Sequence, residues 1–331
     1  MVQCALVSGK PMGLRHGRDF SAHPDGELVA VCDMDPKLLE ALKEEFGVPG
    51  YASLDELLEK CDAELILLIT NETRRIDPLR QVMAAGRNVF TEKPLCGLEG
   101  QYRVREQDAP IAWPAIKDWR ESNVQMGIDY NYRFFTHFQK LHADVVEGRL
   151  GDVKMVRARA HFNCWSHVID QILWSMGLPE WVSCIGDPSE DGGWQRMIHM
   201  QWSNGAVGAL DGSMLWGYDD EPLRVMICGT ERYAEARGLK GWYRRGKSNA
   251  WNQEVEELWE ADSEAERAEM DESFPRMADG VLQAMKEGKP FPADGEAAWN
   301  ELLFEAAVHR SATRGGERVV LADLEADAKK G

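Results

Sequence analysis

The sequence lacks any apolar run long enough to cross a membrane. Of its 331 residues 44% are hydrophobic, an ordinary share for a globular protein, and they are dispersed along the chain. A membrane-spanning helix needs about 20 consecutive apolar residues. Residues 1–7 are already strand-like and lack a basic-then-apolar leader with a cleavage site. We therefore expect neither membrane insertion nor secretion.

Positive charge is also scarce. The chain has 38 Lys and Arg against 56 Asp and Glu, so its formal net charge is −18. Nucleic acids and anionic membranes both need a basic surface on their protein partners. We therefore predict no nucleic-acid partner and no membrane partner. Much of the acidic excess lies in residues 254–272, which we expect to form a solvated face or loop.

Paired cysteine motifs are missing as well. Seven cysteines are scattered without a CxxC pair, and this odd, irregular set favours a reducing cytoplasm over a disulfide framework. No group of histidines and carboxylates has metal-ligand spacing. We predict a cytoplasmic protein without a metal site.

What the chain does contain is two successive patterns of secondary structure. Residues 3–127 alternate between strand and helix signals, which predicts a Rossmann-like, doubly wound parallel sheet in an α/β fold. After residue 127, strand signals at 153–162, 196–202, 206–211 and 223–228 have only one helix signal between them. They predict a second α/β domain with a large, mostly antiparallel sheet. We place the domains at 1–127 and 128–331, with C-terminal helices able to pack back on the first.

One stretch of the first domain has candidate chemistry. Glu92-Lys93-Pro94 follows the apolar run 88–91, so it stands at the carboxyl end of a strand, where open α/β sheets bind ligands. Proline fixes its own φ and restricts the residue before it, which holds Lys93 stiffly. The ordinary alternative is a surface lysine after an edge strand.

The turn after the first strand has few glycines. Of Ser8, Gly9, Lys10, Met12 and Gly13, only Gly13 fills one of the three glycine positions of a dinucleotide fingerprint, so an ordinary βα turn is an equal alternative. Helix amides at Gly13 can hold phosphate, and Lys10 would add charge or crowd the site.

The second strand ends in two aspartates. Asp33 lies 20 residues after Gly13, where a carboxylate accepts the ribose hydroxyls and repels a 2′-phosphate. This position favours NAD over NADP. The alternative is that this turn only caps a helix, which we predict over 36–46 with Asp35 as its cap, and both roles are compatible.

Several pieces in order along the chain are similar to one family. The chain resembles the glucose–fructose oxidoreductase/inositol dehydrogenase (Gfo/Idh/MocA) family in the stretches 13–16, 29–33, 85–94, 130–134, 167–170, 204–208 and 227–230. The resemblance implies a Rossmann domain for a nicotinamide dinucleotide, a second domain whose large sheet often makes oligomer contacts, and an active site between the two. Lys93 matches the family's catalytic lysine, whose bond to Pro94 is commonly cis. His167 matches the histidine that exchanges a proton with the substrate.

The remaining predicted site residues surround these two. We expect cofactor contacts also from Thr70, Asn71, Glu92 and Lys93, and substrate contacts from Tyr132, Arg133, Asn163 and Asp170. An imidazole suits proton transfer near neutral pH, and a fixed ammonium stabilises developing charge on oxygen.

Three departures from the family pattern affect these roles. Asn163 stands where the family has an aspartate four residues before the histidine, and asparagine cannot take a proton. Proton transfer at the site would then depend on His167, or on Asp170 from the same helix. The alternative for Asp170 is a purely structural role. Residues 162–167 also form a shorter connection than is usual. Near Arg75 a family histidine is absent, and we expect Arg74 and Arg75 in a solvated loop, with anion binding as the alternative.

Together these features predict an NAD(H)-dependent oxidoreductase that interconverts a secondary alcohol and a ketone on a sugar, polyol or cyclitol. We expect a homo-oligomer, a dimer or tetramer. One alternative is a non-redox enzyme that keeps NAD bound and recycles it while it cleaves or epimerises a sugar. Another is a non-catalytic sensor of a dinucleotide or sugar.

Overall fold

The computed structural model describes residues 1–8, 11–186, 195–214, 221–248 and 254–330. Their contacts divide the chain into two compact units. The first unit is Met1–Gln101, Ile111–Asp129 and Phe274–Trp299, and the second is Tyr102–Pro110, Tyr130–Ser273 and Asn300–Gly331. The predicted domain boundary between residues 127 and 128 stays a prediction. Among the described residues, no helix combines the length and the apolar character that membrane crossing requires.

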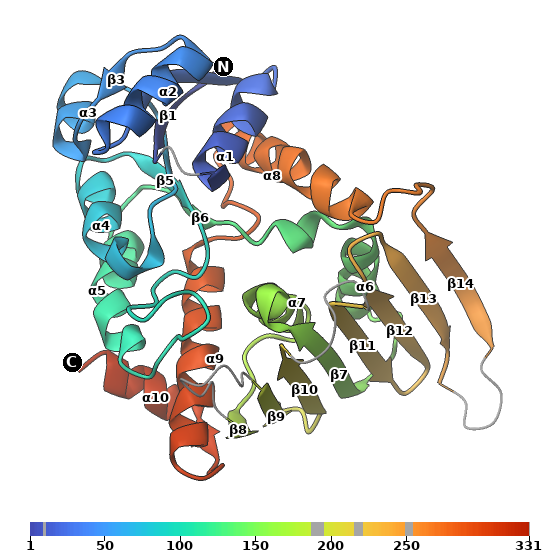
Figure 1. The fold of residues 1–331 in the computed structure, drawn as a ribbon. Coiled ribbons are helices and arrows are strands. Elements are labelled where there is room, and N and C mark those ends of the chain that lie inside the picture. Colours follow the sequence, from blue (N-terminus) through green and yellow to red (C-terminus); the bar gives the residue numbers. More distant parts are fainter. Residues whose placement is uncertain (9–10, 187–194, 215–220, 249–253, 331) are drawn as a thin grey trace. The chain divides into compact units, whose positions relative to one another are not determined.

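The first unit contains a six-stranded sheet in which every paired strand is parallel (Figure 1). The strand order is β3-β2-β1-β4-β5-β6, so it reverses between β1 and β4, which is where doubly wound sheets bind ligands. This confirms the predicted Rossmann sheet. The strands are β1 (Val2–Val7), β2 (Gly26–Cys32), β3 (Gly50–Tyr51), β4 (Leu65–Leu68), β5 (Asn88–Thr91) and β6 (Met126–Ile128).

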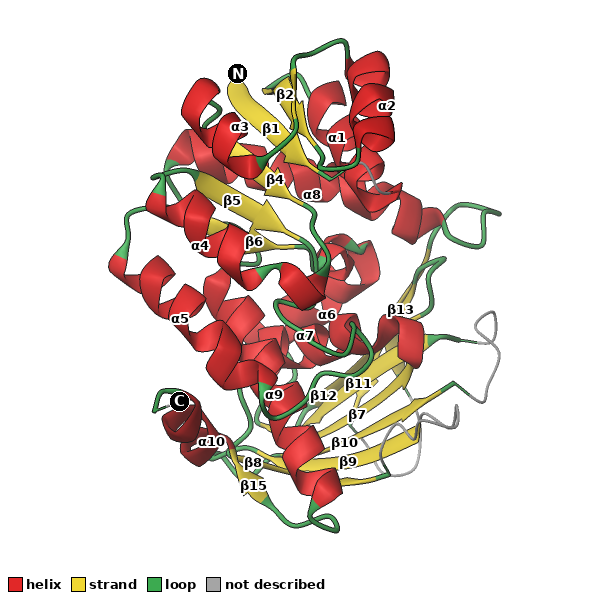
Figure 2. Ribbon diagram, turned by 60° about the vertical axis from the view of Figure 1, so that its left-hand side comes forward, coloured by secondary structure: helices red, strands yellow, loops and turns green. Residues whose placement is uncertain are grey.

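Helices lie on both sides of this sheet (Figure 2). The helix α2 shows how local sequence sets their bounds: Asp35 caps its start by accepting a hydrogen bond from the Lys37 amide at 2.8 Å, and Gly47 ends it with a φ of 66°. Helices wholly or mostly in the first unit are α1 (Pro11–Ala22), α2 (Pro36–Phe46), α3 (Leu54–Lys60), η1 (Glu72–Arg74), α4 (Ile76–Ala84), α5 (Asp108–Glu121) and α8 (Ala268–Glu287).

The second unit is built on a nine-stranded sheet of order β14-β13-β12-β11-β7-β10-β9-β8-β15. Only β7 and β10 pair in parallel, so the sheet is mostly antiparallel, as predicted. The strands are β7 (Val153–His161), β8 (Trp181–Ile185), β9 (Gln195–Gln201), β10 (Val207–Ser213), β11 (Leu223–Gly229), β12 (Arg232–Arg237), β13 (Trp242–Lys247), β14 (Val255–Glu260) and β15 (Val319–Val320).

Helices cover one face of the nine-stranded sheet. Val156 and Ala158 of β7 and Val225 of β11 are buried on that face, where α6 packs on β12 and α7 on β7 and β11. The helical segments wholly or mostly in this unit are η2 (Asn131–Phe134), α6 (Thr136–Val146), η3 (Phe162–Cys164), α7 (Trp165–Met176), α9 (Gly295–Thr313) and α10 (Leu321–Ala328).

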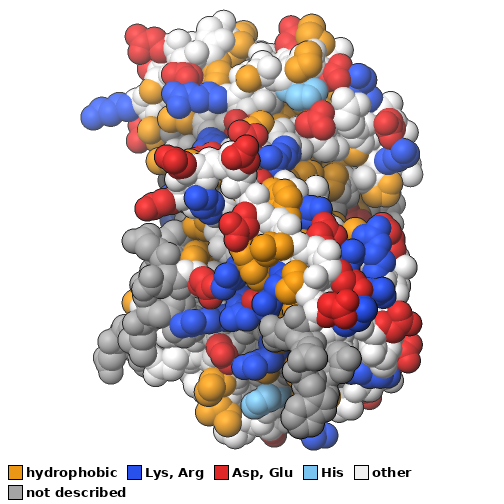
Figure 3. All heavy atoms as spheres, turned by 90° about the vertical axis from the view of Figure 1, so that its right-hand side faces the viewer, with side chains coloured by type: hydrophobic (Ala, Val, Ile, Leu, Met, Phe, Trp, Pro, Cys, Tyr) orange, Lys and Arg blue, Asp and Glu red, His pale blue; other side chains and the backbone are white. Residues whose placement is uncertain are grey.

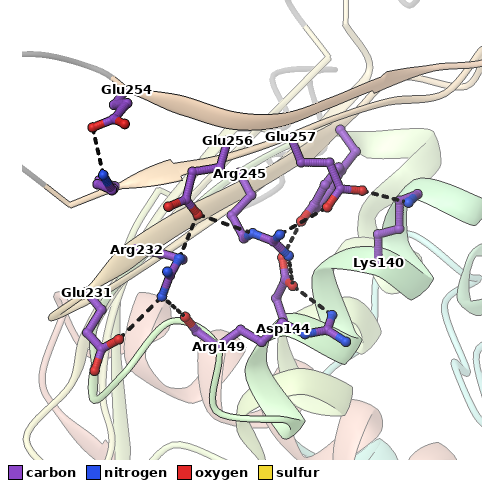
Figure 4. Close-up of polar contacts among 11 residues, drawn as sticks. Lys140, Asp144, Arg149, Glu231, Arg232, Arg245, Glu254, Glu256 and Glu257 are labelled. Carbon is purple, nitrogen blue, oxygen red and sulfur yellow. Dashed lines mark hydrogen bonds and ion pairs between the residues drawn. The ribbon is translucent and has the colours of Figure 1, made fainter.

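Charged side chains connect helix α6 to the strands β13 and β14 at one edge of this sheet (Figure 4). The carboxylate of Asp144 in α6 is buried and accepts hydrogen bonds from Arg245 at 2.7 Å and Arg149 at 3.1 Å. Lys140 pairs with Glu257 of β14 at 2.8 Å. The expectation of a solvated face over residues 254–272 agrees with the exposure of most of β14, and arginines of β12 and β13 pair with some of its glutamates.

Candidate active site

The first βα turn brings the start of α1 against the end of β1. Ser8 has a φ of 110°, and a Cβ on Gly13 would lie 2.0 Å from the Ser8 carbonyl oxygen. Only glycine permits this approach, so Gly13 has the role of the fingerprint's third glycine, the close packing of helix on strand. Met12 is exposed, while Gly9 and Lys10 lie outside the described residues.

The aspartates after β2 divide two tasks. Asp35 caps α2, as predicted. The half-buried Asp33 accepts a hydrogen bond from the Asp35 amide at 2.8 Å, which orders its carboxylate at the carboxyl end of β2. Its expected contact with ribose stays a prediction.

Thr70 and Asn71 follow β4 at the same edge of the sheet. The Thr70 carbonyl accepts a hydrogen bond from Arg75 at 2.5 Å. Asn71 is exposed and caps η1 through the Thr73 amide at 2.9 Å. The Thr70 carbonyl and the Asn71 side chain thus both have hydrogen-bond partners in the segment that follows them. The expected contact of these two residues with a cofactor stays a prediction.

Lys93 is held from several directions within the first unit. Its bond to Pro94 is cis, and its ammonium donates to Gln101 Oε1 at 2.9 Å. Arg75 is buried, and its Nη1 donates to the carbonyl oxygens of Glu92, at 2.5 Å, and Pro94. The expectation of a solvated loop at Arg75 was wrong, because backbone carbonyls supply acceptors for a guanidinium away from solvent.

A buried charge cluster lies immediately beside Lys93. Nε2 of His16, in α1, is 2.9 Å from Glu92 Oε1 and 3.4 Å from Asp129 Oδ2. Burial opposes charge on His16, but hydrogen bonds and charges from Asp129 and Glu92 outweigh it and raise the pKa of His16 to about 10. His16 is therefore an imidazolium at neutral pH.

The two carboxylates of this cluster titrate at different pH values. Burial disfavours both anions, yet the hydrogen bond and charge of His16 lower the pKa of Glu92 to about 2. Burial and the charge of Glu92 raise the pKa of Asp129 to about 6. One nitrogen or oxygen atom from each of His16, Glu92 and Asp129 lies within 4.8 Å of the other two, a spacing that is compatible with a metal ion. The hydrogen bonds of His16 to the two carboxylates also account for this spacing. The predicted absence of a metal stays a prediction.

In the second unit, His167 stands in the first turn of α7. Its ring stacks on Tyr132 with centroids 4.0 Å apart and planes inclined by 13°. Tyr132 in turn stacks on Phe135 at 4.4 Å, and its hydroxyl lies 3.4 Å from Cys164 Sγ. The structure thus brings two predicted site residues together, with the imidazole buried and its ring orientation fixed.

Arg133 and Asp170 form a buried two-point ion pair. Nε and Nη2 of Arg133 donate to the two carboxylate oxygens of Asp170 at 2.8 and 2.6 Å. Burial raises the pKa of Asp170 despite the charge of Arg133. Since Asp170 lies one turn after His167, the pair anchors α7 near the imidazole. This contact favours a structural role for Asp170 over a catalytic one. Direct binding of substrate by Arg133 or Asp170 stays a prediction.

Asn163 lies in η3 and is exposed. Its Oδ1 accepts a hydrogen bond from the Tyr102 hydroxyl at 3.0 Å. η3 runs directly into α7, so the connection before His167 is as short as the sequence indicates.

A buried carboxyl pair in α9 was not predicted. Burial raises the pKa of Glu301 well above its ordinary value and also raises the pKa of Glu305. Glu305 accepts from Trp165 Nε1 at 2.9 Å and faces Arg196 at 3.4 Å, while Tyr130 donates to Glu301 at 3.3 Å. Two glutamates four residues apart on a helix with otherwise apolar neighbours are the sequence signal that could have identified them.

The order of the first sheet, the glycine-dependent turn and the carboxylate after β2 define the dinucleotide-binding class of Rossmann folds. Residues 3–103 match the sequence model of the GFO_IDH_MocA oxidoreductase family, described as an NAD-binding Rossmann fold. Over these residues the chain is similar to the Gfo/Idh/MocA family, in agreement with the predicted resemblance and with a nicotinamide-dinucleotide-binding domain.

Curated relatives share about a quarter of their aligned residues with this chain. The inositol 2-dehydrogenase of Rhizobium meliloti (strain 1021) is 25% identical over 155 residues, 47% of this chain and 44% of the relative. The chain thus spans under half of that relative. The trans-1,2-dihydrobenzene-1,2-diol dehydrogenase of Mus musculus is 27% identical over 246 residues, 66% of this chain and 70% of the relative.

The fold extends over nearly the whole chain in solved structures. The WlbA dehydrogenase of Bordetella pertussis, in complex with NADH and UDP-GlcNAcA, superposes with a TM-score of 0.78 at 21% identity. The superposition covers 96% of this chain and 97% of that protein. At this identity the likeness concerns the fold alone.

Proposed function

We propose that this chain is an NAD(H)-dependent dehydrogenase that interconverts a secondary alcohol and a ketone on a sugar, polyol or cyclitol. The observation that carries the proposal is Lys93, whose backbone and ammonium are both held by hydrogen bonds at the carboxyl end of β5. A lysine fixed in this way beside the dinucleotide-binding edge of a Rossmann sheet suits catalysis better than surface solvation.

The described residues fit a dinucleotide. The close approach at Gly13 leaves the start of α1 without a side chain facing the end of β1, where pyrophosphate binds in this class of fold. Asp33 would accept the ribose hydroxyls, and its charge favours NAD over NADP. Ser8, Met12, Thr70 and Asn71 are the further proposed contacts.

The proposed chemistry divides between an imidazole and an ammonium. His167 accepts the hydroxyl proton of the substrate during oxidation and returns it during reduction. The ammonium of Lys93 stabilises negative charge that develops on a substrate oxygen. A bound nicotinamide supplies the hydride acceptor. The Arg133–Asp170 pair keeps α7, and with it His167, in place.

The test is turnover with a panel of sugars, polyols and cyclitols, followed by the near-ultraviolet absorbance of the reduced cofactor. NAD and NADP are assayed in parallel. Lys93→Ala should lose activity by about 100-fold or more, since it removes charge stabilisation of the transition state. Lys117→Ala, an exposed site on α5, is the matched control. Undiminished turnover by Lys93→Ala would remove Lys93 from the mechanism.

Cofactor stoichiometry separates this function from the alternatives. A dehydrogenase releases NADH in proportion to product. The exposed Asn163, in place of the family aspartate, favours a non-redox enzyme as the second candidate, and such an enzyme would purify with bound NAD and turn over without net reduction. A sensor would bind cofactor or sugar without product.

We also propose that the chain forms a homo-oligomer through the outer face of its nine-stranded sheet. Exposed apolar side chains of four neighbouring strands share this face: Met155, Ile185, Met197 and Val207. In Figure 3 hydrophobic side chains are interspersed with both basic and acidic ones on one face of the molecule. Mixed charge on one patch permits self-complementary pairing of two copies. Light scattering of Met197→Asp should show a smaller species than the unchanged protein.

A further inference from the structure

A short segment after β4 contacts the backbone around Lys93. The buried guanidinium of Arg75 donates to the carbonyl oxygens of the two residues that flank Lys93, Glu92 at 2.5 Å and Pro94. Its second terminal nitrogen donates to the Thr70 carbonyl at 2.5 Å. One planar side chain therefore connects the carboxyl end of β4 to the carbonyl groups of the residues before and after Lys93.

The same segment also determines where the ammonium points. Lys93 Nζ donates to Gln101 Oε1 at 2.9 Å, and the amide of Gln101 donates to Glu72 Oε1 at 2.8 Å. Glu72 opens η1, and Arg75 follows η1 directly. A single helical turn thus holds the main chain of Lys93 through Arg75 and its side chain through Glu72 and Gln101.

Fixing both ends matters because a lysine side chain is long and flexible. Its stem has several rotatable bonds, and the ammonium is a strongly hydrated point charge with no preferred direction of its own. A displacement of about 1 Å at a catalytic group can cost about 100-fold in rate. Arg75 presents a rigid fork that another cation cannot reproduce, since an ammonium lacks two separated, coplanar donors.

We propose that Arg75 and Gln101 are positioning residues for Lys93, Arg75 through the flanking peptide groups and Gln101 through the ammonium. The catalytic consequence rests on the proposed function, whereas the positioning itself can be measured without a substrate. Gln101 gives the ammonium one fixed direction, which a substrate oxygen meets when it binds.

The first measurement is the acetylation rate of Lys93 by acetic anhydride, quantified by peptide mass spectrometry on the folded, full-length protein. Gln101→Met removes the acceptor, so Lys93 should react at least about threefold faster relative to the other lysines. Gln101→Glu keeps an acceptor oxygen and should not accelerate the reaction. Gln107→Met, at an exposed position, is the matched control.

The second measurement concerns Arg75. Arg75→Lys should change the Lys93 acetylation rate by about threefold and lower kcat by at least about tenfold, with the KM for NAD changed by less than about twofold. Arg80→Lys makes the same chemical change on exposed α4, where Arg80 pairs with Asp118 at 2.6 Å, and should change neither quantity. If Arg75→Lys does not fold, the acetylation rates of the Gln101 variants test whether the ammonium of Lys93 is positioned.

The outcomes separate the positioning from the proposed function. Acetylation of Lys93 that stays equal in Gln101→Met, Gln101→Glu and the unchanged protein would overturn the positioning by Gln101. Equal acetylation and equal kcat in Arg75→Lys and Arg80→Lys would overturn the positioning by Arg75. Full turnover by Lys93→Ala would overturn the proposed role of Lys93 while the labelling results still stand.

Discussion

The buried imidazolium of His16 should make the first unit lose stability as the pH rises. Its pKa is about 10 in the folded chain against an ordinary 6.5, so the native state holds the proton more tightly than the unfolded state. The stabilisation is fully present below pH 6.5 and is lost as the pH rises through 10. The difference between 6.5 and about 10 corresponds to about 5 kcal/mol of unfolding free energy.

Simple electrostatics gives a consistent magnitude. At an effective dielectric constant of about 20, unit charges at the 2.9 Å and 3.4 Å separations from Glu92 and Asp129 attract His16 by about 6 and about 5 kcal/mol. Burial of the imidazolium opposes this attraction and costs several kcal/mol, so the net stabilisation is smaller than the sum of the two attractions.

The assay is urea unfolding of the unchanged protein and of His16→Gln across this pH range. Glutamine keeps a hydrogen-bond donor without the charge, so the difference in unfolding free energy should approach 5 kcal/mol near pH 6.5 and vanish near pH 10. His23→Gln, at a partly exposed histidine 3.0 Å from Asp279, is the matched control and should show little change. A difference between His16→Gln and the unchanged protein that is independent of pH would refute the charged cluster.

Three further substitutions test the remaining site assignments. Gly13→Ala should cost about 1–3 kcal/mol of unfolding free energy and weaken NADH binding by fluorescence titration, because its Cβ would meet the Ser8 carbonyl at 2.0 Å; unchanged binding would contradict this. Asp33→Ser should lower the NAD-over-NADP preference in kcat/KM by at least about tenfold, and an unaltered ratio would exclude the ribose contact. Asp170→Asn should cost about 3–5 kcal/mol in urea unfolding by leaving Arg133 buried without a counter-charge, and a loss below about 1 kcal/mol would argue against that pairing.

Elements whose ends are specified locally could be predicted from the sequence. The helix α2 was predicted at its observed bounds, since Asp35, Pro36 and Gly47 mark its start and end within the segment itself. The apolar run 88–91, observed as β5, was predicted for the same kind of reason, because a short, continuous apolar run between helices is typical of a buried parallel strand.

Elements stabilised by distant partners escaped prediction. The strands β12, β13 and β14 are rich in arginine and glutamate, and only their pairing across the sheet, as between Arg232 and Glu256 at 2.6 Å, makes those charges tolerable there. The helix α5 was not predicted, and it contains Pro114, a residue that disfavours the interior of a helix.

The same distinction applies to the site. Lys93 and Gly13 were identifiable from short motifs. The function of Arg75 depends on carbonyls up to 19 residues away, and His16 meets Asp129 across 113 residues of sequence, 129 − 16. No local pattern records such contacts, because the chain brings the groups together only when the sheet assembles.

The two outermost strands of the nine-stranded sheet have a consequence for colloidal behaviour. The strand β15 has two residues and offers little backbone for addition of a foreign strand, whereas β14 is six residues long and contains Glu256, Glu257 and Glu260. If the β14 strand of a second copy paired with β14, the glutamates of the two strands would lie next to each other and repel. Replacement of these glutamates by glutamine would remove that electrostatic barrier, so fibrillar aggregation of this protein should begin at β14.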